Sequence, residues 1–188
     1  MAAKNDSLGK DDWIMAGTQA LADGGLAAVR VEAIARALGI TKGSFYWHFA
    51  NRSALLEAIL ASWEQRQTLS IIDQVELGGG DALTRLESLS RLASADPDSA
   101  VEMTLRDEAL RSEKVAEFVK RVDDQRLGYL RRLFTDLGHN GLEAEARSLL
   151  CYSLLVGDYF IASGHGALDR KDVLRECRRL LFVPPATD

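Results

Sequence analysis

The nine residues TKGSFYWHF, Thr41–Phe49, carry four of the chain's thirteen aromatic side chains. Three of these are consecutive, a histidine follows them, and a polar lead that contains glycine precedes them. Because successive residues of a helix point about 100° apart, a helix here buries Phe45 and Phe49 on one side and turns Tyr46 and Trp47 elsewhere. The stretch therefore predicts a short helix with an aromatic core face and a second face that contacts something outside the core.

The flanking sequence predicts a helix-turn-helix unit around this stretch. A preceding helix, VEAIARALG, ends at Gly39 and has four residues on one stripe, Val31, Ile34, Ala35 and Leu38. Thr41 is a favourable N-cap for the next helix of about eight residues. An earlier helix, from about Asp11 to Ala22, stops at a glycine pair. Two short helices joined by a glycine-containing turn are typical of helix-turn-helix units, although similar corners occur in all-α proteins that do not bind DNA.

Composition describes an ordinary globular protein. The chain has 188 residues, of which 47% are hydrophobic and 27% charged, as in typical globular domains. Its polar opening lacks the apolar core of a secretory signal, and no later apolar run approaches the roughly 18 residues of a membrane span. We therefore expect a cytoplasmic protein without a membrane segment.

Charge and cysteine usage narrow the chemistry further. Cys151 and Cys177 lie inside apolar helical patterns, which predicts reduced, buried thiols. The three histidines show no spacing typical of a zinc site, and we expect neither metal nor cofactor. A net charge of −5 opposes nucleic-acid binding, but residues 30–52 carry four basic side chains against Glu32 alone. Basic groups thus gather where the aromatic run lies.

Helical periodicity runs through almost the whole chain, which contains only three prolines, and this predicts an all-α fold. Asn51 is expected to cap a long helix that runs to about Glu76 and ends at the glycines 78–80. We place a domain boundary within it, which gives an N-terminal three-helix module over residues 1–60 and a larger helical domain over residues 61–188. Further helices are expected over about 81–94, 97–111 with Asp96 as a cap, 113–137, 142–163 and 170–182.

The segment IARALGITKGSFYWHFANRSALLEAIL resembles the N-terminal DNA-binding domain of the TetR family of bacterial transcriptional regulators. The resemblance covers roughly residues 10–60 and rests on the Tyr-Trp-His triplet with a basic residue four positions after His48. It implies a helix-turn-helix DNA-binding domain followed by a helical domain that binds a small-molecule effector and forms a homodimer. A double-stranded DNA operator is the implied partner, and no enzymatic activity is implied.

The resemblance also implies roles for single residues. The positions that meet the major groove, where they read bases or set register, are Thr41, Lys42, Gly43 and Ser44. Those that contact the DNA backbone are Tyr46, Trp47, His48 and Arg52. Arg30 departs from the family pattern, which commonly has Ser or Thr there as a cap. Because arginine cannot accept a capping hydrogen bond, Arg30 either reaches a phosphate or is simply exposed.

Simpler readings remain open for three of these residues. Trp47 is alternatively buried against the following helix, and Lys42 and Arg52 are alternatively solvated charges. For the backbone contacts, Tyr46 and His48 have the donors that phosphate oxygens accept.

The two C-terminal helices are candidates for a dimer interface. The helix over 142–163 is apolar on nearly its whole circumference, so both of its sides must be covered. The helix over 170–182 has one clean apolar stripe opposite a basic face. The predicted interface residues are Leu149, Ser153, Gly157, Val173, Leu174, Cys177 and Leu181. The alternative is that both helices close an intramolecular core.

Arg126 is the polar exception in the apolar stripe of the helix over 113–137. A guanidinium there needs an accepting partner, because burying it unpaired is costly. That partner is an internal carboxylate such as Asp158 or Glu108, or an effector with an acidic or carbonyl group. The residues that would line an effector pocket with Arg126 are Trp63, Met103, Tyr129, Tyr152 and Tyr159, although each also suits an ordinary core.

Together these features predict a ligand-responsive transcriptional regulator. Following the resemblance, it is a repressor whose dimer binds a palindromic operator and is released by the effector. The alternative is a dimeric architectural DNA-binding protein without an effector. An all-α enzyme is a third possibility, against which the sequence offers no nucleophile with a placed base, no metal spacing and no phosphate-binding loop.

Overall fold

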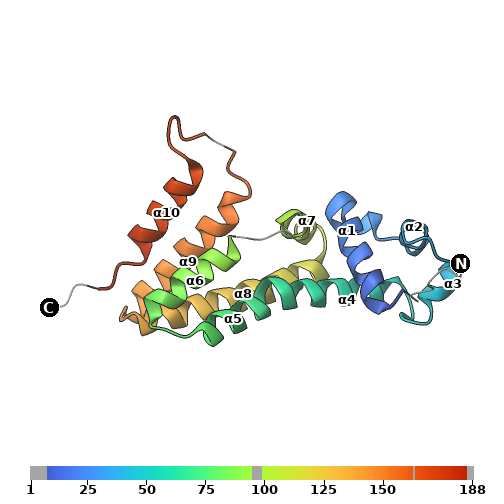
Figure 1. Ribbon diagram of the computed structural model, residues 1–188, viewed down its shortest axis with the longest axis horizontal. Coiled ribbons are helices and arrows are strands. Elements are labelled where there is room, and N and C mark those ends of the chain that lie inside the picture. Colours follow the sequence, from blue (N-terminus) through green and yellow to red (C-terminus); the bar gives the residue numbers. More distant parts are fainter. Residues whose placement is uncertain (1–7, 95–98, 163, 186–188) are drawn as a thin grey trace, which may run out of the picture. The chain divides into compact units, whose positions relative to one another are not determined.

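The computed structural model describes residues 8–94, 99–162 and 164–185. These residues form helices joined by turns and include no strand, which confirms the all-α class (Figure 1). They divide into two compact units, Met1–Arg66 with Asp98–Val119, and Gln67–Pro97 with Lys120–Asp188. These units are defined by which residues pack together. The predicted boundary at residue 60, which separates a DNA-binding domain from an effector-binding and dimerisation domain, therefore stays a prediction.

The helices are distributed over the two units in chain order. The first unit contains α1 (Lys10–Ala28), α2 (Val31–Ala37), α3 (Lys42–Phe45), α4 (Arg52–Glu64), α7 (Ser99–Ala109) and the beginning of α8 (Glu113–Asp136). The second contains α5 (Ser70–Gly78), α6 (Ala82–Ala93), the remainder of α8, α9 (Gly141–Asp158) and α10 (Arg170–Leu181). A short π-helix, η1 (Gln65–Leu69), joins α4 to α5.

An aromatic cluster forms the core of the first unit beside α3. The Phe45 and Phe49 side chains are buried and stacked with ring centroids 5.5 Å apart. Trp13 of α1 meets Phe45 edge to face at 5.2 Å. α1 also packs closely on α4, because a Cβ atom at Gly17 would lie 2.5 Å from Cδ1 of Ile59. The predicted aromatic core face is therefore confirmed.

Three helices end differently from the sequence prediction. α1 does not stop at Ala22 but resumes after a break at Gly24 and Gly25, where Gly25 adopts φ +67°. α3 ends at Phe45, half the expected length, and the chain turns through the next residues with the Phe49 amide donating to the Phe45 carbonyl. α9 ends at Asp158 rather than near residue 163.

The predicted long helix from Asn51 to about Glu76 begins and ends as expected but is not a single α-helix. Asn51 Oδ1 accepts from the Ala54 amide at 3.0 Å, and Gly79, with φ +64°, follows the last turn. Between these ends, η1 widens the helix for five residues. π-helical turns are rare and often mark functional positions.

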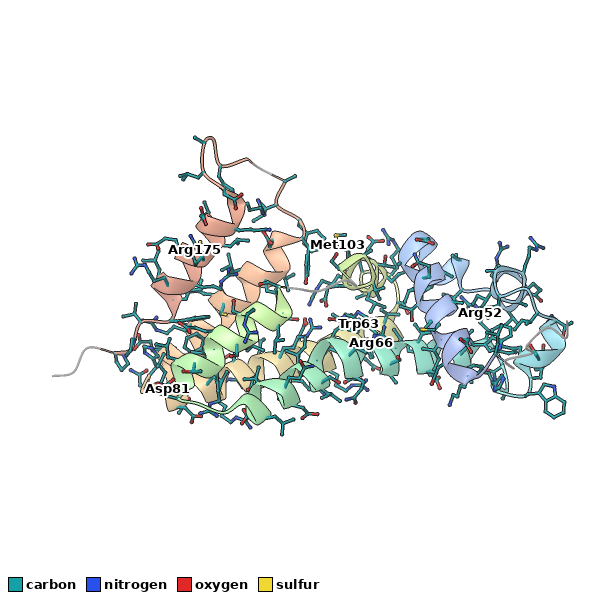
Figure 2. The ribbon with its side chains drawn as sticks, in the orientation of Figure 1. Arg52, Trp63, Arg66, Asp81, Met103 and Arg175 are labelled. Atoms are coloured by element: carbon teal, nitrogen blue, oxygen red, sulfur yellow. The ribbon has the colours of Figure 1, made fainter. Side chains whose placement is uncertain are left out.

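A second core lies in the second unit and is built on α8. Tyr129, Leu130, Leu133 and Phe134 pack with Val75 of α5, Leu86 of α6, Tyr152 of α9 and Phe182. Asp81 and Asn140 cap α6 and α9 through their side-chain oxygens, and Figure 2 labels Asp81 at the start of its helix. The expected cap Asp96 lies outside the described residues.

Candidate functional site

The turn after α3 exposes two large aromatic side chains. Trp47 has 87% of its surface exposed and Tyr46 has 60%, although Phe45 and Phe49 beside them are buried. His48 is partly exposed. The alternative in which Trp47 packs against α4 is therefore excluded. A tryptophan left open to solvent beside a tight core is typical of a contact surface.

A hollow of about 310 Å³ adjoins this turn. Its lining residues are Arg30, Val31, Glu32, Lys42, Phe45, Tyr46, Ala50, Asn51 and Arg52. Lys42 Nζ lies 2.5 Å from Glu32 Oε1. This hydrogen bond lowers the pKa of Glu32 and raises the pKa of Lys42, so both groups are charged at neutral pH. With three cations against one carboxylate, the hollow is suited to an anion.

Arg52 has an internal role that sequence reasoning missed. Its Nε donates to the Val29 carbonyl at 2.6 Å, and a terminal nitrogen donates to the Leu26 carbonyl. The side chain, labelled at the start of α4 in Figure 2, thus ties this helix to the end of α1. Arg52 is accordingly more than a solvated charge, and its contact with a phosphate stays a prediction.

The N-terminal residues of α2 and α3 do not cap their helices with side chains. Arg30 occupies the N-cap position of α2 without a side-chain capping bond, as expected of arginine. Thr41 was expected to cap α3, but its side chain makes no capping bond either. Instead Ser44 Oγ donates to the Thr41 carbonyl at 2.9 Å, so the Ser44 hydroxyl bonds within its own helical turn. A Cβ at Gly43 would meet only Thr41 Oγ1, at 3.6 Å, which leaves this backbone open to close approach.

Arg126 lies at the centre of a polar network in the second unit. Its Nε donates to Thr68 Oγ1 at 2.9 Å, and its terminal nitrogens donate to the Tyr152 hydroxyl at 3.2 Å and to the Gln67 carbonyl at 3.3 Å. Tyr152 in turn donates to Asp123 at 2.6 Å. Two of these acceptors belong to η1, so the guanidinium holds the π-helical turn.

The two carboxylates predicted as partners for Arg126 have other contacts. Asp158 accepts from Arg170 at 2.8 Å, and Glu108 accepts from the Leu26 amide at 3.4 Å. Both lie far from Arg126 in sequence, and periodicity does not determine which acidic residue a buried guanidinium meets.

The six residues predicted to form an effector pocket are divided between the two units. Trp63 and Met103, both labelled in Figure 2, belong to the first unit, and Trp63 is buried against Phe118 with ring centroids 6.0 Å apart. Arg126, Tyr129, Tyr152 and Tyr159 belong to the second. The Tyr129 hydroxyl donates to Glu76 at 2.7 Å, and burial together with this bond raises the pKa of Tyr129. Two members of this set, Arg126 and Tyr152, are joined by a hydrogen bond.

The predicted dimer residues lie on α9 and α10. Leu149 is 56% exposed and Leu142, two turns earlier, is 82% exposed. Ser153 is exposed, and the partly buried members are Gly157, Val173, Leu174, Cys177 and Leu181. Cys151 beside them has its pKa raised to about 12 by burial, which leaves it a thiol. This face of α9 therefore presents large apolar side chains that the described chain leaves uncovered.

The described residues contain neither a membrane-spanning helix nor a cluster of metal ligands. Within residues 8–94, 99–162 and 164–185, no helix is both long and apolar enough to cross a bilayer. The same ranges contain no group of three or more His, Cys, Asp or Glu side chains placed to hold a metal ion.

Residues 14–59 match the model of a family described as bacterial regulatory proteins, tetR family. Residues 14–59 are thus a TetR-family DNA-binding domain. The matched segment begins in α1 and ends within α4, so it contains the exposed turn and the basic hollow. This segment gives the chain the helix-turn-helix DNA-binding unit of TetR-family transcriptional regulators.

Solved structures share the fold over nearly the whole chain. A transcriptional regulator from Rhodococcus sp. Rha1 is 20% identical, with 93% of this chain and 94% of that chain covered and a TM-score of 0.71. A TetR/AcrR-family regulator from Thermobifida fusca is 18% identical, with 92% and 96% covered and a TM-score of 0.63. AibR, solved in complex with isovaleryl coenzyme A and operator DNA, is 18% identical, with 93% and 98% covered and a TM-score of 0.66. No protein of curated function matches significantly.

Proposed function

We propose that this protein is a dimeric, cytoplasmic repressor that binds a palindromic DNA operator and is released by a small-molecule effector. The observation that carries the proposal is the contrast within one turn, where Phe45 and Phe49 are buried and Trp47 is 87% exposed beside a basic hollow. An aromatic side chain and cations on one surface suit the sugar-phosphate backbone of DNA.

The DNA contacts divide by chemistry. Thr41, Lys42, Gly43 and Ser44 enter the major groove, where Lys42 supplies donors for guanine O6 and N7. The backbone contacts come from Tyr46, Trp47, His48, Arg30 and Arg52. Arg52 keeps its two carbonyl bonds to the end of α1 and offers its remaining N–H groups to phosphate, since a guanidinium has five donors.

The uncovered face of α9, with α10 beside it, is the proposed dimer interface. Leu142, Leu149, Leu150 and Leu180 are exposed in the single chain, which costs free energy that a second copy would recover by covering them. A two-fold dimer then presents two copies of α3, each with the turn that follows it, to half-sites about 34 Å apart, one helical turn of DNA. This spacing is why the operator is expected to be a palindrome.

The Arg126 network is the proposed effector-responsive element. A ligand with a carboxylate or carbonyl group that took Arg126 from Thr68 and the Gln67 carbonyl would remove the contacts that hold η1. AibR, with the same fold, was solved with both an acyl coenzyme A and operator DNA, and this fits an effector here. Because Arg126 already has protein acceptors, an architectural protein without an effector is the second candidate.

Capture of genomic DNA tests the proposal. Purified protein is mixed with sheared genomic DNA at moderate salt, and the retained fragments are sequenced. We expect enrichment of a short near-palindrome beside a few genes, and its loss in Trp47→Ala. Leu77→Ala is the matched control, since Leu77 is an equally exposed apolar side chain in the second unit. Retention without sequence preference, or equal loss in both variants, would contradict sequence-specific binding through the α3 turn.

A further inference from the structure

The ion pair between Lys42 and Glu32 joins the two short helices of the helix-turn-helix unit. Lys42 is the first residue of α3 and Glu32 is the second residue of α2. Their charged atoms lie 2.5 Å apart, with side chains 49% and 61% exposed respectively. Lys42 is also a residue proposed to enter the major groove. The same ammonium therefore has one acceptor within the protein and another on DNA.

Glu32 differs in charge from the other ionised residues of this surface. Of the described residues that line the hollow, it alone is acidic, beside Arg30, Lys42 and Arg52. A carboxylate so close to the path of a phosphate backbone weakens binding to every DNA sequence, because like charges repel. We therefore asked which contact of Lys42 with DNA the Glu32 carboxylate prevents.

When Lys42 leaves Glu32 to bind DNA, the free energy gained depends on whether the new acceptor is a phosphate or a base. A lysine ammonium is a compact point charge that binds any phosphate, and phosphate contacts supply most non-specific affinity. If Glu32 already satisfies this charge, a phosphate replaces one anionic acceptor with another and gains little. A base pair that offers guanine O6 and N7 adds directed acceptors, so it offsets the loss of the Lys42–Glu32 ion pair.

We propose that Glu32 is a specificity-determining residue, which withholds Lys42 from DNA phosphates and so lowers binding to non-operator DNA more than binding to the operator. The proposal rests on the DNA-binding function proposed above. It assigns discrimination to a residue that opposes the wrong partner, since specificity is a difference between two affinities.

The test compares Glu32→Gln with a matched variant, Glu57→Gln. Glu57 forms an equally exposed pair with Lys114, 2.7 Å away, in the same unit. Both variants remove one negative charge and one ion pair, but Glu57 does not line the hollow. Affinity is measured over a salt series for short duplexes of random sequence, and for duplexes selected from that pool by the wild-type protein.

We expect Glu32→Gln to bind random duplexes about two- to fivefold more tightly than Glu57→Gln, the range of an exposed ion pair. The slope of log affinity against log salt should steepen by about 0.9, one extra phosphate contact. Affinity for the selected duplexes should rise less, so their preference over random DNA falls. An equal rise for both pools, or a fall for random DNA, would overturn the proposal.

A second pair of variants separates withholding from simple repulsion. In a Lys42→Gln background, Glu32→Gln should tighten binding to random DNA much less than it does with Lys42 present, because no ammonium remains to be released and only direct repulsion is removed. If it still tightens binding to random DNA by the same factor, Glu32 acts by repelling phosphate and the proposal is wrong. If the wild-type protein and all variants bind no duplex, the DNA-binding function itself fails. Circular dichroism checks that each variant is folded.

Discussion

Two surfaces of this protein expose large apolar side chains, and their surrounding charges differ. Trp47 and Tyr46 adjoin a hollow where Arg30, Lys42 and Arg52 face one acid. On α10, beside the leucines of α9, two arginines pair within their own helix, Arg175 with Asp172 and Arg179 with Glu176, and Arg170 pairs with Asp158 of α9. Cations left in excess suit a polyanion, whereas on α10 three of the five cations are paired with neighbouring acids, which gives the apolar side chains the larger part in determining the partner. The first surface therefore fits DNA, and the second fits another copy of the chain.

The largest expected effect is on the α9 surface. Leu149→Glu places a charge where the dimer would bury it, and we expect self-association to weaken by about a hundredfold or more, since an unpaired buried charge costs several kcal/mol. Sedimentation equilibrium measures this. Leu77→Glu is the control, because Leu77 is also strongly exposed but lies on α5. A Leu149→Glu protein that stays dimeric would assign the interface to other residues.

On the DNA surface, Trp47→Ala is expected to lower affinity for selected duplexes about tenfold, a typical loss for a contact residue of this size. Because Trp47 is almost fully exposed, the free energy of unfolding should change by less than about 0.5 kcal/mol. Urea denaturation and sedimentation should therefore match the wild type. If stability falls with affinity, Trp47 has a structural role and the contrast between the surfaces weakens.

Tyr46→Phe is a milder change at the same turn. Loss of one hydroxyl that donates to phosphate should weaken binding to all sequences about threefold, the value of a single hydrogen bond. The salt slope should change little, because the hydroxyl carries no charge to release a counterion. A loss confined to selected duplexes would indicate instead that Tyr46 contacts a base.

Local features of this molecule were predictable from sequence, and features that depend on distant residues were not. Burial of Phe45 and Phe49 followed from helical phase, which needs only their spacing. That Arg126 needs polar partners was also predictable, but Thr68 and Tyr152 lie 58 and 26 residues away in sequence. The π-helical turn escaped prediction because Gln65–Leu69 has no glycine or proline to mark it. The role of Arg52 at the end of α1 was likewise hidden by its distance from Leu26 and Val29.

The smallest expected effect tests whether the paired arginines of α10 differ from the cations of the hollow in their contribution to DNA binding. Arg179 is 65% exposed and pairs with Glu176 at 2.6 Å, so Arg179→Gln should change affinity for any duplex by less than about twofold, as expected of an exposed pair. The salt slope should be unchanged, since no phosphate contact is lost. Arg30→Gln is the matched variant on the basic hollow, where loss of one phosphate contact should reduce the slope by about 0.9. Equal slopes for both variants would mean that charge excess does not distinguish the two surfaces. A reduced slope for Arg179→Gln alone would move the DNA-binding surface to α10.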